Sequence, residues 1–256
     1  MERRWLNRFR AVPEARRGHR RVREARIGRT AVIRQGTPEE LLGPLNAVER
    51  RNAPKLLRYL GNPELLRGWR VSVVGSRAAG EDALRRARRL ARELVAEGVV
   101  VVSGLAEGVD TAAQAATIEA AGRTIGVLGN GLTVHYPAAS RALQDRVAAE
   151  HLLISQFDDS EPPKPTNFPQ RNRVMALVSQ ATVIVDAKER SGTVSQAWEA
   201  IRLGRPLFLV RSLVDKPGLD WPALVLEYGA EILDHTEQIF ERLPPLPEPE
   251  LAELAF

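Results

Sequence analysis

Cysteine is absent from this sequence of 256 residues. Its absence excludes disulfide bonds, thiolate nucleophiles and cysteine-based zinc sites, and it is typical of a cytoplasmic protein. No run of about 18 apolar residues occurs, so we expect no membrane-spanning helix. The N-terminus carries many arginines with no apolar run behind them, a pattern that does not fit a secretory signal.

Catalytic and cofactor motifs are also scarce. The four histidines are scattered, and their spacing to carboxylates or serines indicates neither a catalytic triad nor a metal site. Neither G-x-G-x-x-G nor G-x-x-x-x-G-K-[ST] occurs, so the usual dinucleotide fingerprint and triphosphate cradle are missing. We therefore expect no catalytic residue, no metal and no cofactor.

Charge is divided unevenly along the chain, whose net charge is +5. Residues 1–34 contain twelve arginines against three glutamates, and residues 215–256 contain ten acids against two bases. We interpret residues 1–36 as a basic, partly disordered arm with a short helix at Trp5–Phe9, and residues 244–256 as a Pro-rich acidic tail. The arm could bind nucleic-acid phosphates, remain a solvated extension or dock onto the acidic tail.

Residues 37–243 are expected to form one domain, organised around the stretch Val71–Arg77. Val71–Val74 has the small and β-branched residues of a strand buried on both faces, as in a parallel sheet. Residues 78–98 follow with apolar side chains at helical spacing and arginines on the other face. The turn between them, Gly75-Ser76-Arg77, lies before a helix start, where free backbone N–H groups favour an anion.

Strands and helices then alternate along the chain. This alternation predicts an α/β fold, doubly wound, with a mainly parallel sheet and helices on both faces. Ligands of such folds bind beyond the carboxyl ends of the strands. The expected strands are Val99–Val102, Thr124–Leu128, Leu152–Gln156, Thr182–Ala187 and Pro206–Val210, and the expected helices are Thr111–Ala121, Ala138–Ala149, Arg171–Ser179 and Ser191–Leu203. Leu56–Leu60 is expected to be an edge strand or a short helix.

Glycine and small hydroxyl residues recur where the expected strands end. They allow backbone and hydroxyl donors to approach an anion closely, although every turn of this kind needs some of them. After the turn at Gly75 and Ser76, these residues are Ser103, Gly104, Ser191, Gly192 and Thr193.

The loop before the helix expected at Arg171–Ser179 is the second informative stretch. Arg171, Asn172 and Arg173 would lie at a helix N-terminus, where cations are unfavourable unless a bound anion relieves their repulsion. Alternatively, the two arginines pair with neighbouring acids. Phe168 lies between two prolines, where it could stack on a nucleobase or fill the core. Lys164 and Asn167 lie in the same loop.

These motifs, in this order, resemble the DNA-processing protein A (DprA, also called Smf) family. The resemblance rests on Gly75-Ser76-Arg77, Ser103-Gly104 with Asp110, residues 122–137 ending in Tyr136-Pro137, residues 167–173 and Ser191-Gly192-Thr193. It implies an extended Rossmann-like fold, sequence-independent binding of single-stranded DNA, a homodimer and loading of the RecA recombinase during natural transformation. The family usually has histidine at Gln114, glutamate at Gln156 and Pro-Gly at Arg211-Ser212. The chain is therefore similar to a divergent or shortened member.

In this interpretation four cations contact phosphates, Phe168 stacks on a base, and the turns supply further donors. Phosphate contacts carry no sequence information, so binding should be independent of sequence and weaken with salt. The cations are Arg77, Lys164, Arg171 and Arg173; Asn167 and Asn172 would hold the loop or a base edge; Gly75, Ser76, Ser103, Gly104, Ser191, Gly192 and Thr193 form the turns.

Two other functions remain open. The chain also resembles lonely-guy-type nucleotide phosphoribohydrolases at Ser191–Thr193, but Gln196 stands where their catalytic glutamate would lie, and Glu199 is one turn further along. The same pocket could instead sense a small free nucleotide.

Several apolar residues near the C-terminal end are expected to form either a dimer face or an ordinary core face: Leu224, Val225, Ile232, Ile239, Phe240 and Leu243.

Overall fold

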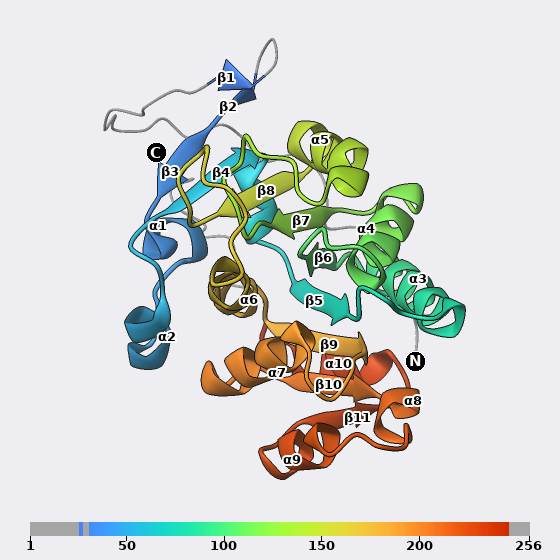
Figure 1. Cartoon of the computed structure of the whole chain (residues 1–256). Helices are drawn as coiled ribbons and strands as arrows, with labels where there is room; N and C mark the ends of the chain where they lie inside the picture. Colours follow the sequence, from blue (N-terminus) through green and yellow to red (C-terminus); the bar gives the residue numbers. More distant parts are fainter. Residues whose placement is uncertain (1–25, 28–30, 246–256) are drawn as a thin grey trace, which may run out of the picture.

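A nine-stranded sheet runs through the computed structural model, which describes residues 26–27 and 31–245 (Figure 1). Its strands are β3 (Arg34–Gly36), β4 (Leu57–Gly61), β5 (Arg70–Gly75), β6 (Val100–Ser103), β7 (Thr124–Val127), β8 (Leu152–Ser155), β9 (Ala181–Asp186), β10 (Leu207–Val210) and β11 (Glu231–Leu233). The order is β11-β10-β9-β5-β6-β7-β8-β4-β3. Seven strands from β11 to β8 are parallel, and β4 and β3 extend the sheet by antiparallel pairing.

Helices cover both faces of this sheet. In Figure 1, α3, α4 and α5 lie to the right of the strands, and α6 and α7 lie to the left. The helices are α1 (Pro38–Leu42), α2 (Ala47–Asn52), α3 (Glu81–Ala96), α4 (Val109–Glu119), α5 (Arg141–Glu150), α6 (Asn167–Val178), α7 (Gly192–Arg202), α8 (Arg211–Val214), α9 (Trp221–Glu227) and α10 (Glu237–Arg242). The 3-10 helices η1 (Pro63–Leu66) and η2 (Ala138–Ser140) and a small antiparallel pair, β1 (Arg26–Ile27) with β2 (Ala31–Val32), complete the described elements.

The strand β5 lies in the interior of the sheet, between β6 and β9. Its Val71, Val73 and Val74 are buried, as expected for a strand with helices on both sides. From β5 the chain winds outward through β6 and β7 to β8, then crosses back to β9 on the other side of β5. The direction of winding therefore reverses at β5, and such a reversal opens a crevice above the carboxyl ends of the strands.

The predicted fold class is confirmed, since the structure has the mainly parallel sheet with helices on both faces. Most expected elements agree with the structure to within about three residues, as is usual at element ends. Leu57–Gly61 is a strand, but it lies between β8 and β3, so it is not at the edge of the sheet. The edge is formed by Arg34–Gly36, which the sequence analysis assigned to the arm.

The predicted helix at Trp5–Phe9, most of the basic arm and most of the Pro-rich tail lie outside the described residues. The described part of the arm reaches the nine-stranded sheet through β3, because Ile33 is buried beside it and Arg34–Gly36 pairs with β4. None of the described helices has the length and hydrophobicity needed to cross a lipid bilayer.

Candidate functional site

The turn after β5 places the Arg77 side chain at the surface, while the two residues before it, Gly75 and Ser76, are half-buried and buried. Gly75 lies so close to α4 that a Cβ there would come within 2.6 Å of the Val109 side chain. The Ser76 hydroxyl accepts a hydrogen bond from the Ala78 N–H at 3.2 Å, which closes the turn. Arg77 follows with an exposed side chain, and no carboxylate among the described residues pairs with it.

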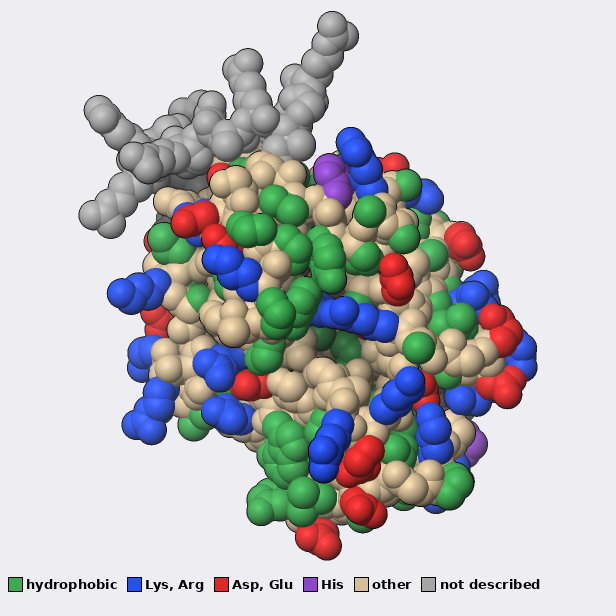
Figure 2. Space-filling model, viewed as in Figure 1, with side chains coloured by type: hydrophobic (Ala, Val, Ile, Leu, Met, Phe, Trp, Pro, Cys, Tyr) green, Lys and Arg blue, Asp and Glu red, His purple; other side chains and the backbone are tan. Residues whose placement is uncertain are grey.

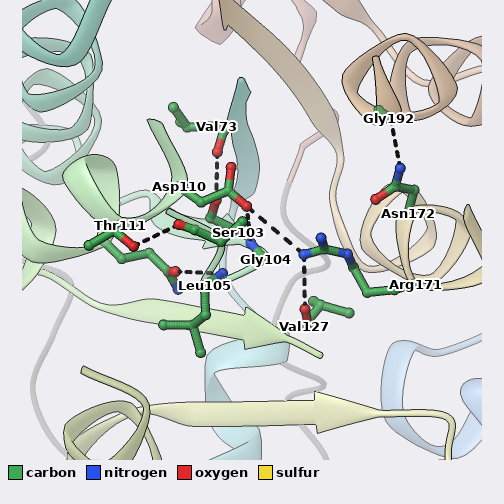
Figure 3. Close-up of polar contacts among 12 residues, drawn as sticks. Val73, Ser103, Gly104, Leu105, Asp110, Thr111, Val127, Arg171, Asn172 and Gly192 are labelled. Carbon is green, nitrogen blue, oxygen red and sulfur yellow. Dashed lines mark hydrogen bonds and ion pairs between the residues drawn. The ribbon is translucent and has the colours of Figure 1, made fainter. Parts of the chain in front are cut away.

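The end of β6 is held by bonds inside the protein. The Ser103 hydroxyl donates to the Val73 carbonyl at 2.7 Å, and the Gly104 N–H donates to the Asp110 carboxylate at 3.0 Å (Figure 3). Both groups are buried. These two donors are therefore already in use, which differs from their predicted role as donors to a bound anion.

Arg171 reaches from α6 across the ends of the strands toward Asp110 (Figure 3). Its guanidinium lies 3.9 Å from the Asp110 carboxylate and donates to the Val127 carbonyl at 3.3 Å. It also fills the space beside Gly104, where a Cβ would overlap the Arg171 Nη1. Arg171 is 6 % exposed, so its charge serves first to hold α6 against β6 and β7.

Burial acts against ionisation of both partners in this pair. Burial raises the pKa of Asp110 above its usual value, and Arg171 and the Gly104 N–H partly oppose that rise. Burial lowers the pKa of Arg171, and the nearby positive charge of Arg77 lowers it further. Two guanidinium groups thus lie close together, and of the two only Arg171 has a carboxylate partner among the described residues. An anion near Arg77 would be stabilised by both charges.

A pocket opens beside these arginines, above the carboxyl ends of β5, β6 and β7. It has a volume of about 110 Å³ and is lined by Arg77, Gly104, Ala106, Glu107, Gly129, Asn130, Tyr136, Pro137, Phe168 and Arg171. We call it the Arg77–Phe168 pocket. In Figure 2, the face toward the viewer is hollowed near its centre, with lysine and arginine side chains around the hollow.

Arg77 and Phe168 meet at this pocket. The Arg77 guanidinium carbon lies 5.0 Å from the centroid of the Phe168 ring, within the range of a cation–π interaction. The ring packs on Gly129, where a Cβ would come within 2.8 Å of it, and lies 5.9 Å from the Tyr136 ring. Phe168 is half-buried, so it supports the loop and also presents ring surface to the pocket.

The helix α6 begins at Asn167, four residues before its expected start. The predicted helix start was wrong because the prolines at 165 and 169 were taken to indicate a loop. The third residue of a helix has no intrahelical N–H partner, so Pro169 is tolerated there. Arg171 and Arg173 therefore lie beyond the first turn, and repulsion by the helix N-terminus does not explain them. Pairing does, because Arg173 contacts the Glu199 carboxylate at 3.2 and 3.3 Å.

The other predicted residues are distributed around the site. Lys164 is exposed and pairs with Glu161 at 2.5 Å. Asn167 is buried in the first turn of α6, and the Asn172 amide donates to the Gly192 carbonyl at 3.0 Å. Ser191 precedes α7, and Gly192 is exposed at its start. Neither they nor Thr193 line the Arg77–Phe168 pocket, and their predicted roles in binding remain predictions.

Six further residues line the pocket and were missing from the predicted site: Ala106, Glu107, Gly129, Asn130, Tyr136 and Pro137. The buried Asn130 amide donates to the carbonyls of Gly131 and Val134 at 3.0 and 2.8 Å, so it shapes the loop after β7. An aromatic residue next to proline in that loop was the signal that could have identified Tyr136.

Comparison with known proteins decides the family. The family model described as DNA recombination-mediator protein A matches residues 38–244. The chain belongs to this DprA/Smf family. DNA processing protein DprA of Streptococcus pneumoniae is 40 % identical over 196 residues, which cover 77 % of this chain and 69 % of that relative. The chain spans 44–65 % of six further relatives, from Bacillus subtilis to Borreliella burgdorferi.

Solved structures of DprA proteins share the fold. The X-ray structure of DprA from Streptococcus pneumoniae matches with a TM-score of 0.70 and 33 % identity, covering 78 % of this chain and 72 % of that one. DprA from Helicobacter pylori matches with a TM-score of 0.68 and 27 % identity, covering 81 % and 94 %. The latter structure is described as showing a single-stranded DNA binding mode. The Rossmann-like architecture expected from the resemblance is confirmed.

Proposed function

We propose that this chain binds single-stranded DNA without sequence preference, through the Arg77–Phe168 pocket, in DNA processing during natural transformation. The observation that carries the proposal is the contact between Arg77 and Phe168 at 5.0 Å, above the carboxyl ends of the central strands. A cation without a carboxylate partner can bind a phosphate, and an aromatic ring can stack on a base. The single-strand binding of the Helicobacter pylori relative supports the same function here.

The remaining predicted residues are assigned by their contacts. Arg77 and Phe168 bind the strand directly, and the exposed Lys164 contacts a neighbouring phosphate. The residues with internal partners hold the pocket in shape, chiefly Ser103, Gly104, Arg171 and Asn172. None of these contacts distinguishes one base from another, so binding should be independent of sequence.

The test is a titration of fluorescent oligothymidine at two salt concentrations. Arg77→Ala should weaken binding and make its salt slope shallower by about 0.7, the contribution of one phosphate on a single strand. Phe168→Ala should cost about 1–3 kcal/mol, the value of one stacked base. Arg123→Ala is the matched control, because Arg123 is exposed at the amino end of β7 and forms no ion pair with the described residues. Binding by Arg77→Ala equal to the control would contradict the pocket assignment.

The two alternative functions have less support in the structure. Glu199, the acid that could replace the missing hydrolase glutamate, is buried and contacts Arg173 at 3.2 Å and Arg202 at 3.6 Å. It does not line the pocket. A nucleotide sensor would use the same pocket, and the single-strand binding of the Helicobacter pylori relative favours a DNA strand there over a free nucleotide. The family is one of recombination mediators, not of hydrolases.

The family description supports an inference about the partners. We infer that the bound strand is passed to the RecA recombinase, as expected of a recombination mediator, and that the protein acts in the cytoplasm. We also propose a homodimer. Hydrophobic side chains gather at the lower edge of Figure 2, over α9, where Leu224 and Tyr228 are 45 % and 62 % exposed. The Tyr228 ring packs edge-on against Trp198 at 5.3 Å, which fixes its position.

Two of the residues expected to form either a dimer face or a core face belong to the core. Val225 and Ile239 are fully buried in the core, so they cannot contact a second copy directly. Leu224→Glu with Tyr228→Glu should therefore convert the dimer to a monomer in light scattering, because burying two carboxylates in an apolar interface is unfavourable. Val48→Glu on α2 is the control, since Val48 is also exposed, at 47 %. A wild type that is already monomeric would disprove the dimer.

A further inference from the structure

A second hollow lies next to the Arg77–Phe168 pocket, on the other side of α6. Its volume is about 470 Å³, and it is bounded by residues 51–56, Arg58, Gln156, Gln170 and Arg173. We call it the Arg51–Arg173 groove. One wall is the chain that connects α2 to β4, and the other is the second turn of α6. None of the groove residues was in the predicted site except Arg173.

The groove is strongly positive. Arg51, Lys55, Arg58 and Arg173 line it, and no carboxylate of the described residues does. Arg58 pairs with Asp158 at 2.5 Å and with Asp159 at 3.5 Å, and Arg173 pairs with Glu199.

Arg51 and Lys55 are both exposed, and the side chain of neither forms a hydrogen bond or ion pair with the described residues. Two cations of the groove are thus uncompensated. Their mutual repulsion would be relieved by a polyanion bound between them.

One helix separates the groove from the pocket. Phe168 and Arg171 of α6 line the pocket, and Gln170 and Arg173 of the same two turns line the groove. The Gln156 amide donates to the Gln170 side-chain oxygen at 2.8 Å, so a neutral amide pair joins the end of β8 to this helix. Figure 2 shows arginine and lysine side chains both around the central hollow and to its left, over α2. Positive charge therefore continues from the pocket onto the neighbouring face.

We propose that the Arg51–Arg173 groove holds the sugar–phosphate backbone of the strand whose neighbouring nucleotide occupies the Arg77–Phe168 pocket. The DNA strand crosses the start of α6, and Arg51 and Lys55 contact two of its successive phosphates. Ala53, Pro54 and Leu56 give the groove an apolar margin on which a base can rest. The path rests on the proposed function, and it extends the footprint on DNA well beyond the pocket.

A nucleic-acid strand fits these observations better than an acidic peptide does. The two hollows share a helix, their lining has six cations against one carboxylate, Glu107, and a strand carries phosphates at regular spacing past both. An acidic peptide would explain the groove but not its continuity with a pocket that contains a half-buried aromatic ring. Peptide binding is an outcome of the test below.

The test combines two variants in a cycle. Wild type, Arg77→Ala, Arg51→Ala/Lys55→Ala and the triple variant are titrated with an oligothymidine of about 16 nucleotides, within the range of known single-strand site sizes. Arg51→Ala/Lys55→Ala should bind about tenfold more weakly at low salt, with a salt slope shallower by about 1.4 for two lost phosphate contacts. Because one strand touches both regions, the triple variant should show the product of the two losses.

The control is Arg85→Ala/Arg123→Ala, which removes the same charge far from the groove. Both side chains are exposed, and the pair between Arg85 and Asp82 is a surface pair of little energetic value. If Arg51→Ala/Lys55→Ala binds like this control while Arg77→Ala is weakened, the groove proposal is wrong and the pocket stands. The groove would then be left for an acidic peptide.

Two other outcomes are informative. If Arg77→Ala binds like wild type, the pocket assignment fails, and the continuous path fails with it. If each variant alone loses about twofold or less but the triple variant loses nearly all binding, the pocket and the groove are separate sites, which also overturns the proposal.

Discussion

Arg171→Met should lower the free energy of unfolding by about 3–5 kcal/mol, the usual cost of removing one partner from a buried ion pair. The variant leaves the Asp110 carboxylate 4 % exposed with no cation beside it. It also removes the hydrogen bond to the Val127 carbonyl. Urea unfolding monitored by circular dichroism measures the loss, and the linear extrapolation gives its size.

The effect should depend on pH in a defined direction. Burial already raises the pKa of Asp110, and losing Arg171 removes an opposing influence, so the folded-state pKa rises further. A carboxyl whose pKa is higher in the folded than in the unfolded state holds its proton longer when folded. Stability then falls as pH rises from the unfolded to the folded pKa. The difference in free energy of unfolding between Arg171→Met and wild type should therefore be smallest at acidic pH and increase toward neutral pH.

Asp110→Asn in the Arg171→Met background separates charge from packing. Asparagine keeps an oxygen that can accept from the Gly104 N–H but carries no charge. The double variant should recover most of the lost stability. Its free energy of unfolding should also no longer change with pH through ionisation of residue 110. If it is as unstable as Arg171→Met alone at every pH, then the packing of the guanidinium, and not its charge, holds α6 in place.

Gly108→Ala should be comparably damaging, for a reason in the backbone. Gly108 has φ of 80°, a conformation that residues with a side chain rarely adopt. A Cβ there would also overlap the Ser76 carbonyl oxygen and lie 2.7 Å from that of Arg77. Because both contacts are with backbone, rotamer changes cannot relieve them. We expect a loss of about 3 kcal/mol or more in the free energy of unfolding, together with a displaced Arg77 turn.

Gly192→Ala is the matched control for this prediction. Gly192 starts α7, a Cβ added to it would meet no atom within 4 Å, and its φ is not positive. Alanine there should leave stability unchanged or raise it by about 0.4–1 kcal/mol through the unfolded state. Thermal and urea unfolding of both variants check the pair. Equal stability of Gly108→Ala and Gly192→Ala would contradict the steric argument.

The sequence predicted what depends on local pattern. Val71–Val74 was identified as a doubly buried strand by its composition, and β5 lies where the winding of the sheet reverses. The strand-end glycines and Arg77 were placed at the correct edge of the sheet. Phe168 and Arg77 were both predicted site residues, and their contact joins two stretches that lie about ninety residues apart in the chain.

The rest depends on contacts between distant segments. Ser103 and Gly104 were interpreted as free donors because neither the Val73 carbonyl nor the Asp110 carboxylate could be placed from spacing alone. Arg171 was predicted to contact a phosphate, and its burial could not be foreseen because it depends on how α6 crosses β6 and β7. The groove was missed because its walls come from residues 51–58 and from α6, which no local motif connects.

The close approach of Arg171 to Gly104 has an evolutionary consequence. Any side chain at position 104 would occupy the volume that the guanidinium fills, so arginine at 171 tolerates only glycine there. Replacing Gly104 therefore forces the Arg171 guanidinium out of its place beside Asp110, whereas replacing Arg171 leaves glycine free to remain at position 104. The constraint runs in one direction, from the arginine to the glycine.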